Sequence, residues 1–260
     1  MKTRKLLTGL AIMLYVASGC GGGSGTGGSA APGAVNAAPP PPAESSASGA
    51  TISGKVAFSG TAPKPTPINM SADPICVQKH QGKAETEAVV VNSNGTLKNV
   101  FVYVKSGLEG KTFPAPAEPM IFDQRGCQYL PHVFGIRAGQ PLKIVNSDGT
   151  LHNVHALPKL NTPFNQAMPK FMKETTKKFD KPEQMVKFQC EVHNWMNAWA
   201  GVMDHPFYSV TGDDGTFTIK GLPPGNYEIV AWHEKYGMQT QKVTVTGTES
   251  KQVDFKFAAS

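Results

Sequence analysis

The chain has 260 residues, among them 27 glycines and 21 prolines, and charged residues make up only 17%. Aromatic residues make up 8%, and Val, Ile and Phe gather in short runs, so composition excludes a wholly disordered chain. The longest apolar stretch is too short and too near the start for a multipass membrane protein. Three of the 25 basic residues precede that stretch, and the remaining 22 against 19 acidic residues leave a charge of +3. This balance predicts no nucleic-acid partner.

Residues 1–19 have the organisation of an export signal, in which basic residues precede an apolar run and small residues follow it. Cys20 comes directly after the small residues, and this segment resembles the bacterial lipobox. The resemblance implies that Cys20 is lipidated and becomes the mature N-terminus. The two glycines that follow resemble the outer-membrane sorting signal of Gram-negative lipoproteins, which implies a periplasmic, lipid-anchored protein. An ordinary signal peptide with an incidental cysteine is the alternative.

Residues 20–50 are mainly Gly, Ser, Ala and Pro, with little charge and no apolar periodicity. Such a segment cannot bury enough apolar surface to order itself, so we expect a flexible linker. Together with a lipid on Cys20, the linker would tether the folded part to a membrane surface.

From residue 51 onward the signals are short and β-like. The runs 88–91 and 100–104 flank Asn94-Gly95, which predicts a hairpin whose two central residues both have positive φ. No segment has a convincing 3.6-residue apolar stripe, so the pattern predicts an all-β chain built as a sandwich or barrel. Further strands are predicted at 143–145, 153–157, 175–179 and 185–190.

Residues 206–260 form a compact run of predicted hairpins. The segment from Asp214 to Tyr227, with its Gly-Leu-Pro-Pro-Gly turn, resembles carboxypeptidase regulatory-like domains, which are transthyretin-like in fold. The resemblance implies a small C-terminal β-sandwich module. The strand 51–58 is similar to the opening strand of that module, so we expect it to pair with the C-terminal unit.

Two segments hold the residues with the clearest chemistry. Cys190 and His193 are three residues apart just past a predicted strand end, where a turn can direct both side chains at one ion. His152, from a separate strand, would complete a trigonal set of two imidazole nitrogens and one thiolate. This is the blue-copper arrangement, in which a weak thioether occupies the axis.

These segments resemble plastocyanin-type cupredoxins over about residues 85–205, and we place a Greek-key cupredoxin β-sandwich at 51–205. The resemblance implies one type 1-like copper ion, with His152, Cys190 and His193 as strong ligands and Met196 on the axis. It also implies that Asn153 braces the two ligand loops. The spacing departs from the family pattern, because two residues rather than four separate the second histidine from the methionine.

His155 follows on the same strand as His152. Successive side chains of a strand point to opposite faces, so both histidines cannot reach one ion without a bulge. We choose His152 for the metal and expect His155 to be a surface residue or, alternatively, a ligand of a second site.

Cys76 and Cys127 are the remaining cysteines, and in an oxidising compartment they are expected to form a disulfide. The alternative is a zinc site in which His80 and His132 supply the other two ligands.

The sequence therefore predicts a non-enzymatic copper protein that passes single electrons between redox partners. Seven lysines against three acidic residues lie between 159 and 187, and such a run could steer an acidic redox partner. The alternative is a solvated loop without a partner. A copper-delivery module, with His155 and Met203 on the transfer path, is the rival function. A purely structural β-domain protein is the third alternative.

Overall fold

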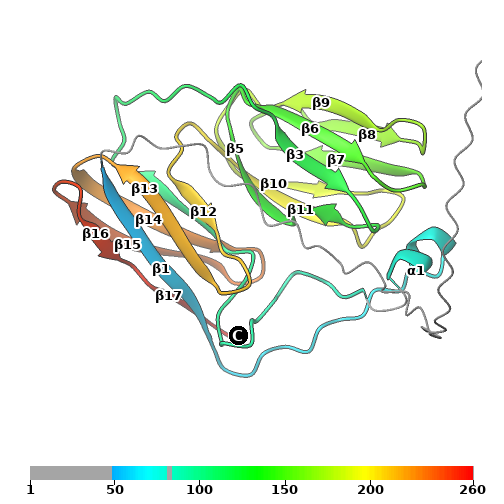
Figure 1. The fold of residues 1–260 in the computed structure, drawn as a ribbon, viewed down its shortest axis with the longest axis horizontal. Helices are drawn as coiled ribbons and strands as arrows, with labels where there is room; N and C mark the ends of the chain where they lie inside the picture. Colours follow the sequence, from blue (N-terminus) through cyan, green and yellow to red (C-terminus); the bar gives the residue numbers. More distant parts are fainter. Residues whose placement is uncertain (1–48, 81–83, 260) are drawn as a thin grey trace, which may run out of the picture. The chain divides into compact units, whose positions relative to one another are not determined.

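The computed structural model describes residues 49–80 and 84–259. The export signal, Cys20 and the predicted linker as far as residue 48 lie outside these residues. Within the described ranges the chain has 17 strands and one helix, which confirms the all-β prediction (Figure 1). No helix of the described part is both long and apolar enough to cross a membrane.

Two β-sandwiches make up the described chain, and the first holds the predicted ligands. Its core includes the mutually packed rings of Phe122, Phe134 and Phe188. One sheet has the order β5 (Val133–Arg137), β11 (Asn197–Met203), β10 (Glu183–Gln189), β7 (His152–Leu157) and β8 (Phe164–Met168). The other has the order β4 (Tyr129–Leu130), β3 (Met120–Gln124), β6 (Pro141–Asn146) and β9 (Glu174–Lys178).

The second sandwich has a separate core, to which Ile52, Phe217 and Ile229 contribute. One sheet is built on β1 (Ala50–Ser59), with β13 (Thr216–Leu222) on one side and β16 (Ser250–Gln252) and β17 (Phe255–Ala258) on the other. The other sheet has the order β12 (Tyr208–Val210), β2 (Phe101–Ser106), β14 (Gly225–His233) and β15 (Gly237–Val245).

Strand pairing divides the chain differently from the predicted boundary at residue 205. β1 pairs with the C-terminal strands, as the resemblance of its sequence led us to expect. β2 also belongs to the second sandwich, because it pairs with β12 and β14, whereas the sequence analysis placed it in the first. Alternate side chains of β2 serve two sets of contacts: Val102 and Val104 lie in the core of the second sandwich, whereas Phe101 and Tyr103 pack against residues of the first.

The predicted hairpin at Asn94-Gly95 is a turn, but its geometry differs from the prediction. Only Gly95 has a positive φ, of 77°, and its N–H donates to the carbonyl of Asn92. Asn92 in turn pairs with Thr96, which is the pattern of a three-residue loop with a bulged glycine. The strand expected at 88–91 is reduced to a single bridge between Val91 and Leu97.

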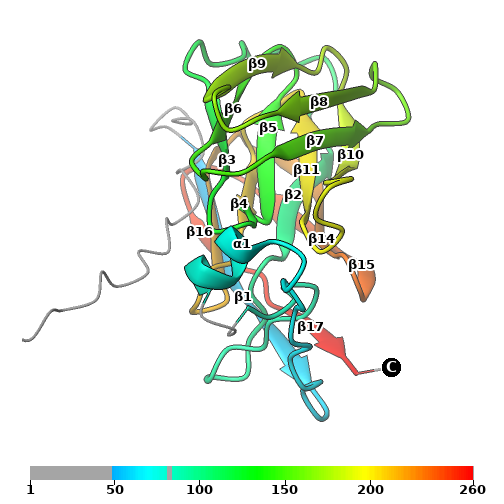
Figure 2. The same ribbon diagram turned by 90° about the vertical axis from the view of Figure 1, so that its right-hand side faces the viewer.

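The helix α1 (Pro74–His80) lies in the long connection between β1 and β2. Asp73 caps its N-terminus, because Asp73 Oδ1 accepts the N–H of Ile75 at 2.8 Å, and Pro74 occupies the first helical position. Although both flanking strands belong to the second sandwich, Figure 2 shows α1 beside the end of the first sandwich. Sequence periodicity did not predict this helix, since seven residues are too few to show a stripe.

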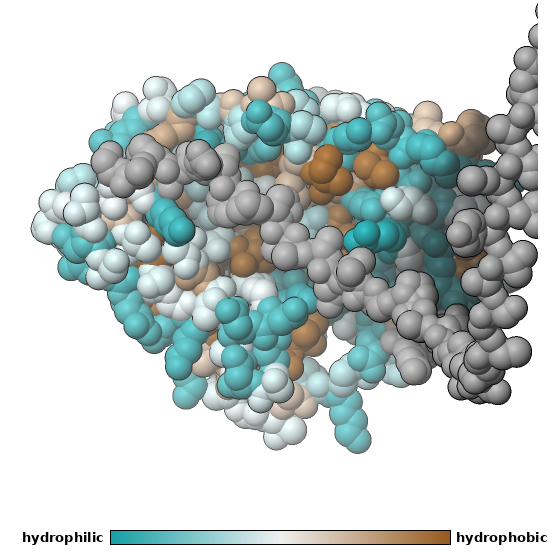
Figure 3. Space-filling view, in the orientation of Figure 1, coloured by the Kyte–Doolittle hydropathy of each residue, from teal (hydrophilic) through white to brown (hydrophobic). Residues whose placement is uncertain are grey.

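Aromatic rings pack between the two sandwiches. Phe101 and Tyr208 of the second sandwich stack at 5.6 Å and contact a glycine pair, Gly201 and Gly135, on neighbouring strands of the first. A Cβ atom on Gly135 would lie 2.1 Å from the Tyr208 ring, and one on Gly201 would lie 2.4 Å from the Phe101 ring. Elsewhere, the coloured atoms of the face in Figure 3 are mainly hydrophilic, with hydrophobic ones in small separate patches.

Candidate metal centre

The structure brings together the three side chains predicted as strong ligands. His152 opens β7, Cys190 directly follows β10, and His193 lies in the loop before β11. Their ligand atoms all lie within 4.8 Å of one another, and the two imidazoles face each other with Nδ1 atoms 2.9 Å apart. All three are buried, with at most 3% of each residue exposed.

The loop after β10 has the tight turn that the Cys-x-x-His spacing requires. The N–H of His193 donates to the Cys190 sulfur at 3.3 Å, so the chain folds back within three residues. The N–H of Met196 donates to the carbonyl of His193, and the N–H of Cys190 to the carbonyl of Met196. The Met196 side chain is buried, but its assignment as the axial ligand stays a prediction.

Asn153 connects β7 to the ligand loop. Its side-chain oxygen accepts the backbone N–H of Glu191 at 2.6 Å, and its amide nitrogen donates to Asn165. This contact is the brace that the sequence resemblance implied.

His155 lies on the other face of β7, as strand alternation predicts. Its Nδ1 is 2.6 Å from a carboxylate oxygen of Glu191, and its side chain is 26% exposed. Met203, the other residue of the copper-delivery alternative, packs between the sandwiches with Phe101 and Tyr103. The structure therefore gives these two residues different surroundings and does not group them with Cys190.

Asp148 contacts His152 at Nε2, the ring nitrogen that points away from Cys190 and His193. This residue was not predicted from the sequence. One oxygen of Asp148 is 3.0 Å from His152 Nε2 and also accepts the N–H of Cys127, while the other accepts the N–H of Gly126. The Lys79 ammonium completes its surroundings at 3.0 Å. The only available sequence signal was its position four residues before His152, in a segment that indicates a turn.

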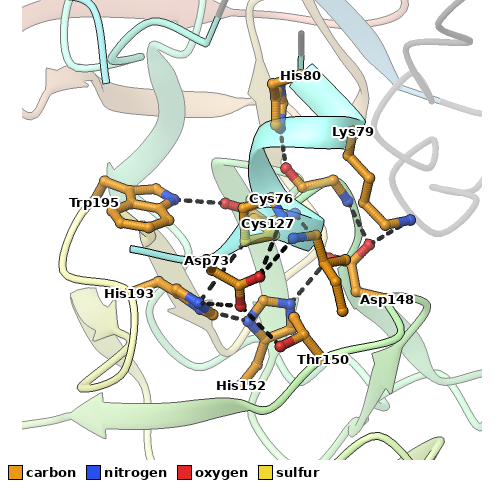
Figure 4. Close-up of a disulfide and its surroundings, with 12 residues drawn as sticks. Asp73, Cys76, Lys79, His80, Cys127, Asp148, Thr150, His152, His193 and Trp195 are labelled. Carbon is orange, nitrogen blue, oxygen red and sulfur yellow. Dashed lines mark hydrogen bonds and ion pairs between the residues drawn. A yellow bond between two sulfur atoms is a disulfide. The ribbon is translucent and has the colours of Figure 1, made fainter. Parts of the chain in front are cut away.

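The predicted disulfide between Cys76 and Cys127 is present and fastens α1 to the turn between β3 and β4 (Figure 4). The zinc alternative is wrong, because both of its cysteines are consumed by this bond. Its histidines also have other partners: His80 Nε2 meets the carbonyl of Gly126, and His132 lies between the carbonyl of Asn197 and the Glu234 carboxylate.

Asp73, at the start of α1, also lies beside the centre. Its Oδ2 accepts the Thr150 hydroxyl at 2.8 Å and is 3.1 Å from His193 Nε2 (Figure 4). Burial raises the pKa of Asp73, but the Thr150 hydroxyl, the helix N–H groups and His193 together lower it below its ordinary value. The carboxylate is therefore ionised at neutral pH.

Trp195 packs against the same imidazole. Its ring lies 4.9 Å from that of His193, and its Nε1–H donates to the carbonyl of Cys127 at 3.0 Å. The half-buried indole thus helps to fix His193.

The electrostatics of the centre favour a thiolate. Burial raises the pKa of Cys190, but His152, His193 and the backbone N–H groups of Asn153 and His193 outweigh burial and lower it to about 6. Burial also lowers the pKa of His152, yet Asp148 and Cys190 outweigh it and raise that pKa above its ordinary value.

The donor set fits a soft cation. With both Nε2 atoms beside carboxylates, the two Nδ1 lone pairs and the Cys190 thiolate converge on one buried point. The Nδ1 atoms are within hydrogen-bond distance of each other, and together with the sulfur they offer a cation three donors. Two imidazoles and a thiolate suit copper, whereas magnesium and calcium prefer oxygen ligands.

Comparison with known families and structures gives two kinds of similarity. Residues 202–258 match the family model of the carboxypeptidase regulatory-like domain. The match covers β12–β17, and the sandwich is completed by β1 and β2 from outside it. No curated protein matches the chain.

The structural neighbours include an amicyanin variant in its Cu(I) form, which is 17% identical with a TM-score of 0.30 and covers 39% of this chain and 98% of its own. A purple cupredoxin from Nitrosopumilus maritimus is 17% identical with a TM-score of 0.28, covering 32% and 98%. A copper-containing nitrite reductase from Thermus scotoductus SA-01 is 19% identical with a TM-score of 0.29, covering 36% and 26%.

Proposed function

We propose that the chain is a mononuclear copper protein that transfers single electrons between redox partner proteins. The observation that carries this proposal is the convergence of His152, Cys190 and His193 in a buried site. Copper bound there would supply one-electron exchange between Cu(I) and Cu(II).

The surroundings of the three donors support electron transfer because they hold each donor in place. Asp148 fixes His152, and the turn through Met196 fixes the Cys190 backbone. A disulfide fastens the neighbouring turn to α1. Donors that cannot relax serve both oxidation states in one arrangement, so little reorganisation is needed when an electron moves.

The proposed setting is the periplasm, with the chain tethered to the outer membrane through lipid on Cys20 and the linker 20–50. The proposed partner is acidic, because Lys170, Lys173 and Lys178 are exposed on and around β8 and β9. Electrostatic steering by such a surface would raise association rates and would weaken with added salt.

The test is addition of Cu(II) to the purified protein. We expect one copper per chain and an intense visible band from the thiolate. Cys190→Ser should abolish the band, because a hydroxyl is a much weaker copper donor. His152→Ala and His193→Ala should shift or bleach the band, and Met196→Leu should leave copper bound.

His155→Ala is the matched control, because it removes an imidazole on the same strand that faces Glu191 instead. It should leave the band unchanged. Bleaching by His155→Ala but not by His152→Ala would overturn the assignment. Tight binding of Cu(I) alone would favour delivery over electron transfer, and no uptake of metal would leave only a structural role.

A further inference from the structure

We propose that Asp73 is a positioning residue of the metal centre, which keeps the proton of His193 on Nε2 and so leaves Nδ1 free to bind the metal. This inference rests on the proposed copper site. It assigns a role in that site to α1 and its N-cap, although this segment lies between two strands of the other sandwich.

The two ligand histidines have matching outer contacts. His152 Nε2 is 3.0 Å from Asp148, and His193 Nε2 is 3.1 Å from Asp73. A carboxylate accepts and cannot donate, so each imidazole presents an N–H to its carboxylate at Nε2, which leaves Nδ1 as the ring atom available to a metal. Carboxylates in this place fix the tautomer and ring orientation of a metal-bound histidine.

The two carboxylate oxygens of Asp73 contact different parts of the protein. Oδ1 accepts the N–H of Ile75 and caps α1, whereas Oδ2 accepts from Thr150 and faces His193. One side chain thus couples the start of the helix to the metal ligand. The disulfide at Cys76, three residues further on, holds this arrangement against the first sandwich.

The two oxygens make Asp73→Asn an informative variant. An asparagine has one oxygen, and if that oxygen caps the helix, its NH₂ group faces His193 Nε2. Two donors cannot pair, so the imidazole proton would move to Nδ1 and block metal binding. Outer partners of metal ligands typically contribute 10–100-fold in affinity, and we expect Asp73→Asn to weaken Cu(I) binding by about that factor.

Two further variants separate positioning from folding. Asp73→Ser keeps a good N-cap but cannot reach His193, so the helix should persist while metal affinity falls. Thr150→Val removes the other contact of Oδ2 and leaves the His193 contact, so it should retain affinity within a few-fold. Loss of the carboxylate should also raise the reduction potential, because a negative charge beside a ligand stabilises Cu(II).

The decisive measurement is the ¹⁵N spectrum of the His193 ring in the metal-free protein, with Cu(I) affinity measured beside it. We expect Nε2 to be protonated in the wild type and in Thr150→Val, and deprotonated in Asp73→Asn. An unchanged ring spectrum together with wild-type affinity in both Asp73→Asn and Asp73→Ser would overturn the proposal. If the wild type bound no copper, the proposed function would fail, yet the ring spectra would still decide whether Asp73 orients His193.

Discussion

Two of the buried histidines, His233 in the second sandwich and His152 in the first, have opposite chemistry. In the second sandwich, burial lowers the pKa of His233 to about 4, and its Nδ1 accepts the N–H groups of Lys235 and Tyr236. In the first, Asp148 and Cys190 outweigh burial and raise the pKa of His152. Burial therefore keeps the imidazole of His233 neutral, whereas a buried carboxylate and thiolate favour the protonated form of His152.

Removing the Asp148 carboxylate is expected to cause the largest loss in the free energy of unfolding. Asp148→Ala would leave the Lys79 ammonium, two backbone N–H groups and His152 without their shared acceptor. Breaking a buried charged pair costs about 3–5 kcal/mol, and we expect unfolding by guanidinium to show a loss of this size.

Asp213→Ala, in the second sandwich, is the control for that experiment. Its carboxylate pairs with Lys98 at 2.8 Å but is 75% exposed, so the change should cost less than about 1 kcal/mol. Equal losses in the two variants would contradict the contrast between the buried and the exposed carboxylate.

Removing the disulfide should have the next largest effect. The bond joins residues 51 apart, and replacing both Cys76 and Cys127 with serine should lower the unfolding free energy by about 3–4 kcal/mol. Because α1 carries Asp73, copper affinity should fall as well. Unfolding curves and copper titrations measure the two losses, and unchanged copper affinity would show that α1 stays in place without its bond.

His233, one of the buried histidines, predicts a pH dependence. Between pH 4 and about 6.5 the unfolded chain binds a proton that folded His233 does not, so stability falls as the pH falls through this window. The full loss amounts to about 3 kcal/mol. His233→Gln can still accept a hydrogen bond and should flatten this slope in unfolding curves taken across the window; an unchanged slope would assign it to another group.

The smallest predicted change in stability comes from His132, and its pH dependence is opposite to that of His233. Burial lowers the pKa of His132, but the Glu234 carboxylate, with Glu87, outweighs it and raises the pKa above its ordinary value. The pair therefore stabilises the fold below about pH 6.5 and loses this contribution as the pH rises through the raised pKa. Glu234→Gln should remove about 1–2 kcal/mol on the acid side and little on the alkaline side. Equal losses at both pH values would mean that the charge is not involved.

The functional residues that could be predicted from the sequence are those that lie close together in short motifs. Strand alternation separated His152 from His155, and the Cys-x-x-His spacing predicted the turn. Sequence reasoning missed Asp73, because 120 residues separate it from His193 and a seven-residue helix has no periodic signature. The Asp-Pro pair that starts α1 was the available signal, since an N-cap followed by proline is a typical helix start.

The division into sandwiches was harder to predict for a related reason. β2 is an apolar run whose sequence would fit either sandwich. Its position is determined by pairing with β12 and β14, which are distant in the sequence. Sequence similarity to a module identified β1, whose local pattern alone would not have done so.

The glycine pair beneath the rings of Phe101 and Tyr208 has a consequence for exchanging modules. Since even one methyl group on Gly135 would overlap the ring of Tyr208, the two sandwiches fit as a matched pair rather than as interchangeable units. A chimera that grafts a different C-terminal module onto the first sandwich must therefore bring rings that fit the flat backbone at Gly135 and Gly201. It must also replace β1 and β2, because the second sandwich is built from two separate parts of the chain, one before the first sandwich and one after it.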